Sequence, residues 1–201
     1  MLIIGLTGGI ACGKSNISAT LRELGAVVID GDALSRQLTA PGGIALPGIR
    51  KAFGKSVFHD DGTLDRRALG QIVFSDDTAR QALDDLMQPL LLDMIRAGIA
   101  DARQAGAEVC VLDMPLLYEK GLERLCDRVW CAWLPRHTQL ERLMARDGFS
   151  EREALDRINS QMPTDEKATR ADIVIDTSGT IQYTKDCIRT LYAQETGSAL
   201  R

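Results

Sequence analysis

The feature that most limits how this chain can fold lies near its start, where residues 8–15 read Gly-Gly-Ile-Ala-Cys-Gly-Lys-Ser. This stretch matches the pattern G-x-x-x-x-G-K-[ST]. An apolar run at residues 2–6 precedes it, and an amphipathic helical pattern follows it. Glycines let successive backbone N–H groups turn into one concavity, and the N-terminus of the helix adds partial positive charge. The sequence therefore predicts a phosphate-binding loop, called the phosphate loop below, between a strand and a helix.

The side chains of the phosphate loop have separate expected roles. The Lys14 ammonium can reach the β- and γ-phosphates of ATP, and the Ser15 hydroxyl can ligate Mg²⁺. Because the backbone cradles the phosphates, the neighbouring positions are also expected to contact ATP; they are Gly8, Gly9, Ala11, Cys12, Gly13 and Asn16. Cys12 has two interpretations: a thiol whose pKa is lowered at a helix N-terminus, or a small residue that the loop tolerates with its thiol buried.

Short apolar runs indicate strands that are covered on both faces, because they lack the polar alternation of a half-exposed strand. There are five, at residues 2–6, 26–29, 109–112, 129–134 and 173–175. Helical patterns lie between them; after the first run, Ile17, Leu21 and Leu24 fall on one helical face, and Gly25 is a plausible stop. The alternation predicts a three-layer α/β fold around a parallel sheet of about five strands.

Two longer stretches do not fit a minimal sheet. Residues 33–105 carry helical stripes and are expected to form a mostly helical insert. Residues 136–170 are rich in arginine and contain a capping box at Ser150 and Glu153, which predicts a helix start. We expect one domain, with these two segments added to a core at about residues 1–32, 106–135 and 171–201.

Composition narrows the class of protein. The net charge of −4 disfavours non-specific nucleic-acid binding, which needs a basic surface. Because no apolar run approaches the roughly 20 residues of a membrane span and the start does not resemble a signal peptide, we expect no membrane partner. The five cysteines show no C-x-x-C pairing, which is typical of reduced thiols in a cytoplasmic protein.

Carboxylates follow two of the predicted strands, where the carboxyl ends of a doubly wound sheet line the ligand crevice. Asp32 could orient an acceptor hydroxyl and accept its proton as general base, or it could be a turn or helix-cap residue. Asp30 would then be a structural residue or a partner of Mg²⁺-bound water. Asp113 occupies the usual place of a carboxylate that holds Mg²⁺ in such proteins, and the alternative is a loop residue before Pro115.

A phosphate loop leaves the reaction open. Switch GTPases need an N-K-x-D motif, which is absent, and the one D-x-x-G, at residues 176–179, leaves too little chain after it. An ATP-driven motor would need more chain and an arginine from a neighbouring subunit. A small kinase fits the length best. A kinase for a nucleoside, nucleotide or sugar acid, and a nucleotide-binding regulatory module without an acceptor, remain alternatives.

Five motifs occur in a fixed order along the chain: T-G-G-I-x-x-G-K-S (7–15), I-D-x-D (29–32), D-G-x-L-x-R-R (61–67), P-L-L-Y-E (115–119) and R-D…R-I-x-x-Q (146–161). Together they resemble the dephospho-CoA kinase family, and the resemblance extends over residues 3–192. The resemblance implies transfer of the γ-phosphoryl group of ATP to the ribose 3′-hydroxyl of dephospho-CoA, giving coenzyme A and ADP. It also implies a helical CoA-binding insert at residues 33–105 and a mobile lid at residues 136–170. The resemblance is compatible with a monomer.

The resemblance also assigns roles by motif position. Asp32 becomes the base, with Lys14 and Arg146 also catalytic, and Arg142 and Thr177 join the ATP contacts. The acceptor would be bound by Asp32, Arg66, Arg67, Gln88, Leu116, Tyr118 and Gln161. The chain departs from the family pattern at Ala11-Cys12 for Gly-Ser, Asn16 for Thr, Gln88 for a His before Pro, and Thr177 for an Asn near the adenine.

Overall fold

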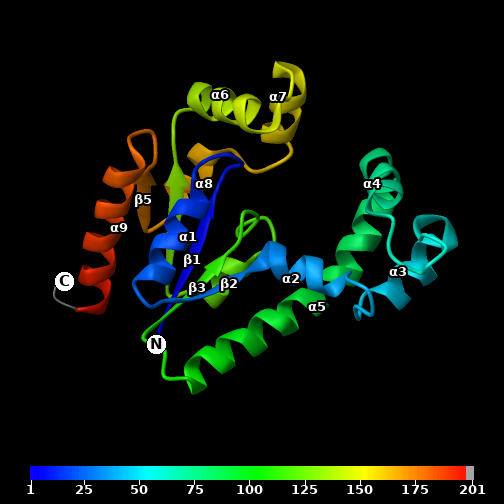
Figure 1. The fold of residues 1–201 in the computed structure, drawn as a ribbon, viewed down its shortest axis with the longest axis horizontal. Helices are drawn as coiled ribbons and strands as arrows, with labels where there is room; N and C mark the ends of the chain where they lie inside the picture. Colours follow the sequence, from blue (N-terminus) through cyan, green and yellow to red (C-terminus); the bar gives the residue numbers. More distant parts are fainter. Residues whose placement is uncertain (198–201) are drawn as a thin grey trace. The chain divides into compact units, whose positions relative to one another are not determined.

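The computed structural model describes residues 1–197. Its centre is one five-stranded sheet in the order β2-β3-β1-β4-β5 (Figure 1). The strands are β1 (Leu2–Gly8), β2 (Val27–Asp30), β3 (Val109–Asp113), β4 (Arg128–Trp133) and β5 (Ile173–Asp176). The pairing of β1 with β3 and β4, and of β4 with β5, is parallel. The predicted α/β fold with a parallel sheet of five strands is confirmed.

The two edges of the sheet differ from the expectation of strands covered on both faces. Every residue of β3 is buried. Val27 in β2 and Val174 in β5 are instead 37% and 47% exposed. An edge strand has a neighbour on one side only, so less of its surface is covered, and an apolar run does not reveal which strands will lie at an edge.

Helix α1 (Lys14–Glu23) follows the phosphate loop and ends as its glycine predicts. Gly25 has a φ of 94°, and the N–H of Ala26 donates to the carbonyl of Leu21 at 3.0 Å. Helix α9 (Ile181–Thr196) packs beside α1. Together they cover a buried apolar cluster on the sheet, which includes Ile4, Leu6, Ile17, Leu21, Val111, Trp130, Ala132 and Ile188.

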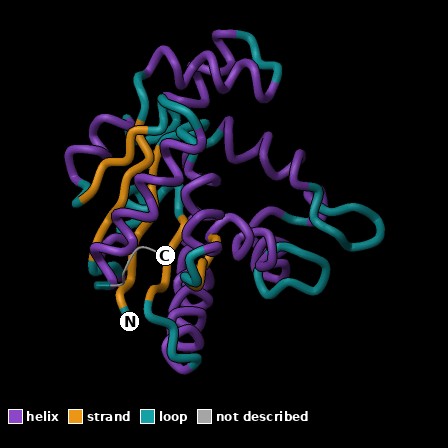
Figure 2. The backbone as a smooth tube through the Cα atoms, turned by 60° about the vertical axis from the view of Figure 1, so that its left-hand side comes forward, coloured by secondary structure: helices purple, strands orange, loops and turns teal. Residues whose placement is uncertain are grey.

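Three helices lie between β4 and β5: α6 (Arg136–Asp147), α7 (Glu151–Asn159) and α8 (Thr164–Arg170). The predicted capping box starts α7, since the Ser150 hydroxyl accepts from the Glu153 N–H and the Glu153 carboxylate accepts from the Ser150 N–H. Helices α6 and α7 pack on each other, while α8 packs on β4 and β1. Figure 2 shows the strands running side by side with helices around them.

The chain divides into two compact units, residues 1–29 with 101–201 and residues 30–100. The second unit holds α2 (Gly31–Leu38), α3 (Leu46–Phe53), α4 (Arg66–Ser75) and most of α5 (Asp77–Gln104), with the short 3₁₀ turn η1 (Lys55–Val57); a second such turn, η2 (Leu122–Leu125), belongs to the first unit. The second unit has its own apolar cluster, which includes Leu38, Ala45, Ile49, Val57 and Leu69. Within residues 1–197, no helix combines the length and apolarity that a membrane crossing requires.

Candidate active site

The phosphate loop connects β1 to α1, and its glycines are required by backbone conformation and by space. Gly13 caps α1 with a φ of 76°, in the left-handed region that favours glycine. Gly9 lies so close to Thr164 Oγ1 and Gln139 Nε2 that a Cβ atom would overlap both. The loop therefore lies tightly against the segment that carries α6 to α8.

Ala11 is the one described non-glycine residue with a positive φ, at 61°. The left-handed conformation costs an L-residue with a Cβ atom about 1–2 kcal/mol. Ala11 holds this conformation in the middle of the phosphate loop, so the surrounding contacts must offset the strain. Ala11 stands where the family pattern has glycine, and it therefore carries a conformational cost that the sequence alone does not reveal.

Lys14 and Asp113 form an ion pair at the carboxyl edge of the sheet. Asp113 is the last residue of β3 and lies opposite Leu6 of β1, which leads directly into the phosphate loop. The side chain of Asp113 is 6% exposed and that of Lys14 is 17% exposed. A cation and a carboxylate are thus held together beside the predicted phosphate site.

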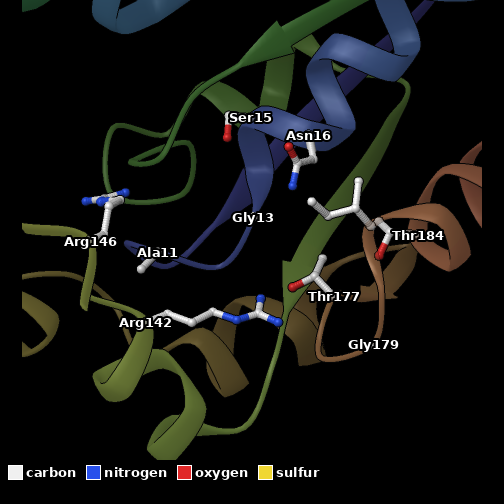
Figure 3. A pocket seen from close by; sticks show the side chains of 10 residues that line it. Ala11, Gly13, Ser15, Asn16, Arg142, Arg146, Thr177, Gly179 and Thr184 are labelled. Carbon is white, nitrogen blue, oxygen red and sulfur yellow. The ribbon is translucent and has the colours of Figure 1, made fainter. Parts of the chain in front are cut away.

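A cavity of about 430 Å³ opens beside the loop (Figure 3). It is lined by Ala11, Gly13, Ser15, Asn16, Arg142, Arg146, Thr177, Gly179, Ile181 and Thr184. Arg142 extends from α6 along the cavity towards Thr177, and its Nη2 donates to the Ser178 carbonyl at 3.3 Å. Arg146 donates two hydrogen bonds of 2.8 Å to Asp147. Two guanidinium groups one helical turn apart therefore face a cavity whose other wall is the phosphate loop.

Comparison with known proteins decides which family has this arrangement. The family model described as dephospho-CoA kinase matches residues 2–183. A dephospho-CoA kinase of Carboxydothermus hydrogenoformans is 45% identical over 94% of this chain and 92% of the relative. The chain belongs to the dephospho-CoA kinase family. It is therefore a kinase of the family that catalyses the final step of coenzyme A biosynthesis.

Solved structures agree with the assignment. A protein from Thermus thermophilus superposes with a TM-score of 0.83 and 34% identity, covering 98% of each chain. The dephospho-CoA kinase from Campylobacter jejuni superposes with a TM-score of 0.74 and 25% identity, covering 97% of each chain. The sheet and the helices around it are therefore those of known P-loop kinases.

Thr177 lines the cavity, but its hydroxyl is engaged elsewhere. Thr177 Oγ1 lies 2.9 Å from the Cys12 carbonyl and 3.2 Å from the Trp133 carbonyl, and the residue is 5% exposed. The hydroxyl therefore ties the phosphate loop to the end of β4. The structure gives the Thr177 hydroxyl an anchoring contact, and the contact of Thr177 with ATP stays a prediction.

The hypothesis of a lowered pKa at Cys12 is wrong. Cys12 is 1% exposed and belongs to the main apolar cluster, with its sulfur 3.8 Å from Thr164 Oγ1. Burial raises the pKa of the Cys12 thiol and outweighs the hydrogen bond with Thr164, which lowers it. The alternative interpretation, a small buried residue that the loop tolerates, describes Cys12 correctly.

Two of the predicted acceptor-binding residues are engaged inside the fold. Tyr118 is 7% exposed, its ring lies 4.1 Å from the Arg170 guanidinium carbon, and burial raises its pKa to about 12. The Gln161 side-chain carbonyl accepts from the backbone N–H of Ile10 in the phosphate loop at 3.1 Å. Leu116, the third residue of this group in the first unit, is half-buried. The structure thus gives Tyr118 a packing position and Gln161 a contact with the loop.

Sequence reasoning missed Lys167, whose side chain is fully buried on α8. Its Nζ donates to the Pro115 carbonyl at 2.6 Å and pairs with Glu119 at 2.8 Å. Glu119 also accepts from the Met162 N–H at 3.0 Å. Lys167 therefore ties α8 to the loop that follows Asp113. The sequence carried little signal for this, because a lysine among other charged residues is usually solvated.

In the second unit, Asp30 and Asp32 open α2. The Asp30 carboxylate accepts from the Ala33 N–H at 2.9 Å and is the N-cap of the helix. Asp32 lies in the first turn. The N-cap of α2 is therefore Asp30 and not Asp32, and the choice between a base and a turn residue for Asp32 stays a prediction.

The other predicted acceptor-binding residues lie on α4 and α5. Arg66 Nη2 donates to Thr39 Oγ1 at 2.6 Å. Arg67 and Arg66 line a second cavity of about 560 Å³ in the second unit, which Gly70, Gln71, Phe74 and Ser75 complete. Gln88 is exposed on α5, directly before Pro89. The structure brings Arg66 and Arg67 together around one cavity.

Proposed function

We propose that this kinase binds ATP through the phosphate loop and transfers the γ-phosphoryl group to the ribose 3′-hydroxyl of dephospho-CoA. The observation that carries the ATP site is the cavity between the phosphate loop and the two arginines Arg142 and Arg146. Lys14, a further cation of the same loop, is paired with Asp113. Backbone N–H groups and three cations match the charge of a triphosphate. The acceptor, dephospho-CoA, is inferred from the family to which the chain belongs.

In this proposal, the partner of the Lys14 ammonium changes when ATP binds. In the structure this ammonium is held by Asp113. The β- and γ-phosphates compete with Asp113 for that ammonium, so ATP binding releases the carboxylate. A released Asp113 lies beside the loop, where carboxylate and hydroxyl oxygens are the hard donors that Mg²⁺ prefers.

We assign Mg²⁺ to Ser15 Oγ and the Asp113 carboxylate. One or two protein oxygens are the usual protein share of such a site, with phosphate oxygens and water completing it. When bound, the ion would neutralise charge on the phosphate oxygens. Within residues 1–197, no three His, Cys, Asp or Glu side chains gather as a metal cluster.

The arginines of α6 supply the remaining positive charge. Arg142 and Arg146 lie on one face of the helix, at i and i+4, and both line the cavity. We propose that α6 and α7 close over bound ATP and bring these guanidinium groups onto the transferring group. Closure would also exclude water, which otherwise would accept the phosphoryl group.

Asp32 is the proposed general base. The acceptor 3′-oxygen attacks Pγ while the bond from Pγ to the β,γ-bridging oxygen breaks, and its electron pair leaves with ADP. Asp32 takes the proton of the 3′-hydroxyl. Because Asp30 already caps α2, the Asp32 carboxylate is not needed for that purpose. The acceptor is proposed to be held by Arg66, Arg67, Gln88 and Leu116.

The free thiols support an assignment to the cytoplasm. All five cysteines of the chain are unpaired in the structure. Reduced cysteines are typical of a cytoplasmic enzyme. We propose a monomer, which sedimentation equilibrium of the purified protein would test.

An acceptor panel tests the function directly. ADP release is followed with ATP alone and then with dephospho-CoA, a nucleoside, a nucleotide or a sugar acid added. Only dephospho-CoA should stimulate ADP release, with coenzyme A appearing in equal amount by mass spectrometry. Stimulation by another acceptor would indicate a different small kinase, and stimulation by none would indicate a nucleotide-binding module.

A further inference from the structure

The peptide groups on either side of Ile10 are held by two glutamines. Gln139 Nε2, on α6, donates to the Ile10 carbonyl at 2.9 Å. Gln161 Oε1, between α7 and α8, accepts from the Ile10 N–H at 3.1 Å. The backbone groups fix the orientation of both amides, because a carbonyl can only accept and an N–H can only donate. Both hydrogen-bonding groups of one phosphate-loop residue are therefore satisfied by the segment that follows β4.

The position of Ile10 makes these two bonds important. The next residue, Ala11, holds the strained left-handed conformation. Gln139 is 3% exposed and also lies against Gly9, so its side chain has little freedom to move away. The two bonds hold the loop on the N-terminal side of the strained residue. They are among the contacts that offset its strain.

Apolar packing joins the same elements. A cluster of Leu143, Ala154 and Ile158 is buried between α6 and α7, and Ile10 and Ala11 of the phosphate loop pack against it. Helix α6 is also the helix that carries Arg142 and Arg146. The phosphate loop and the arginine-bearing helix are therefore connected by two hydrogen bonds and one apolar cluster.

We infer that Gln139 and Gln161 are positioning residues that set the phosphate loop for the triphosphate and couple it to α6 and α7. By fixing Ile10, they keep the following N–H groups aimed at the phosphates. They act through the loop and need no contact with ATP or with the acceptor. This inference rests on the proposed ATP site.

Substitution by methionine and by glutamate separates positioning from general stability. Gln139→Met and Gln161→Met keep side-chain length and lose the hydrogen bond. Gln161→Glu retains an accepting oxygen towards the Ile10 N–H, whereas Gln139→Glu places an oxygen against the Ile10 carbonyl. Both glutamates add one negative charge near the same residue, so each controls for the charge of the other. Gln182→Met, at an exposed glutamine of α9, is the surface control.

The kinetic readout is the KM for ATP, with the KM for dephospho-CoA and the melting temperature measured beside it. Each methionine variant should raise the KM for ATP by about two- to tenfold, the factor that one hydrogen bond supplies, and lower kcat less. The KM for dephospho-CoA should stay the same. Gln161→Glu should recover most of its loss, and Gln139→Glu should recover none.

Wild-type KM values in both methionine variants, or equal effects of the two glutamates, would overturn the inference. Hydrogen exchange of the wild-type enzyme is a second measurement that needs no variant to fold. ADP binding should slow exchange at the Ile10 amide and in α7 together, and protection of Ile10 alone would contradict the coupling. Normal turnover in Lys14→Ala would instead show that the proposed ATP site is wrong.

Discussion

Lys14 of the phosphate loop and Asp113 at the end of β3 are paired with each other in this structure. In P-loop proteins, a lysine at this position binds the β- and γ-phosphates, and a carboxylate after a neighbouring strand holds Mg²⁺. Their pairing keeps a nearly buried carboxylate neutralised. In the proposed ATP site, the phosphates would compete with this carboxylate for the Lys14 ammonium.

The first prediction follows from that competition. In Asp113→Asn, the Lys14 ammonium loses its carboxylate partner, so ATP in the absence of Mg²⁺ should bind at least about fivefold tighter, because hydrogen bonds between charged groups are worth more than neutral ones. Turnover with Mg²⁺ should nevertheless fall. Isothermal titration calorimetry with and without Mg²⁺ measures the affinity, and Lys14→Ala, which should nearly abolish turnover, is the companion variant. An unchanged Mg²⁺-free affinity would mean that the pair does not oppose ATP.

The second prediction concerns Cys12. Because burial raises the pKa of its thiol, little thiolate is present at pH 8, and iodoacetamide should label Cys12 of the folded protein slowly whether or not ATP is bound. The half-buried Cys187 should react first. Mass spectrometry of tryptic peptides measures both rates. Fast labelling of Cys12 that ATP prevents would restore the reactive-thiol hypothesis.

The third prediction uses the strain at Ala11. Ala11→Gly removes about 1–2 kcal/mol of left-handed strain and adds about 0.5–1 kcal/mol of chain entropy cost, so the free energy of unfolding should rise by about 0.5–1 kcal/mol. The same substitution at Ala19, exposed on α1, should lower it by about 1 kcal/mol. Urea denaturation measures both. Equal losses in the two variants would show that Ala11 is not strained.

The fourth prediction concerns the buried ammonium of Lys167. Lys167→Met leaves the Pro115 carbonyl and the Glu119 carboxylate without this donor, and breaking a buried pair typically costs about 3–5 kcal/mol. The Glu119 side chain is 23% exposed and keeps its bond from the Met162 N–H, so we expect a loss of about 2–3 kcal/mol in the free energy of unfolding. Adding Glu119→Gln should restore part of it. Additive losses in the double variant would contradict a pair.

Local signals explain what the sequence predicted well. The five strands were predicted as uninterrupted apolar runs, α1 as an amphipathic face that ends at Gly25, and α7 as a capping box. Each of these signals lies within a window of a few residues. The phosphate loop is of the same kind, because its glycines and Lys14 occur at fixed spacing.

Contacts between distant residues explain what the sequence did not predict. Gln139 and Gln161 reach Ile10 across 129 and 151 residues of chain, and no periodic pattern marks such a pair. Lys167 is buried because the fold places an acceptor carbonyl beside it. The raised pKa of the Cys12 thiol likewise depends on the tertiary packing around it, which the helix N-terminus alone does not reveal.

The most direct measurement is the rate of coenzyme A formation by Asp32→Asn, with ATP affinity measured on the same protein. Asn keeps the shape of the side chain and cannot accept the proton, so kcat should fall at least about 10²-fold while ATP affinity stays within a few-fold. Asp30→Ala, which removes the cap of α2, should instead lower the free energy of unfolding by about 1 kcal/mol. Near-normal coenzyme A formation by Asp32→Asn would contradict the proposed transfer mechanism.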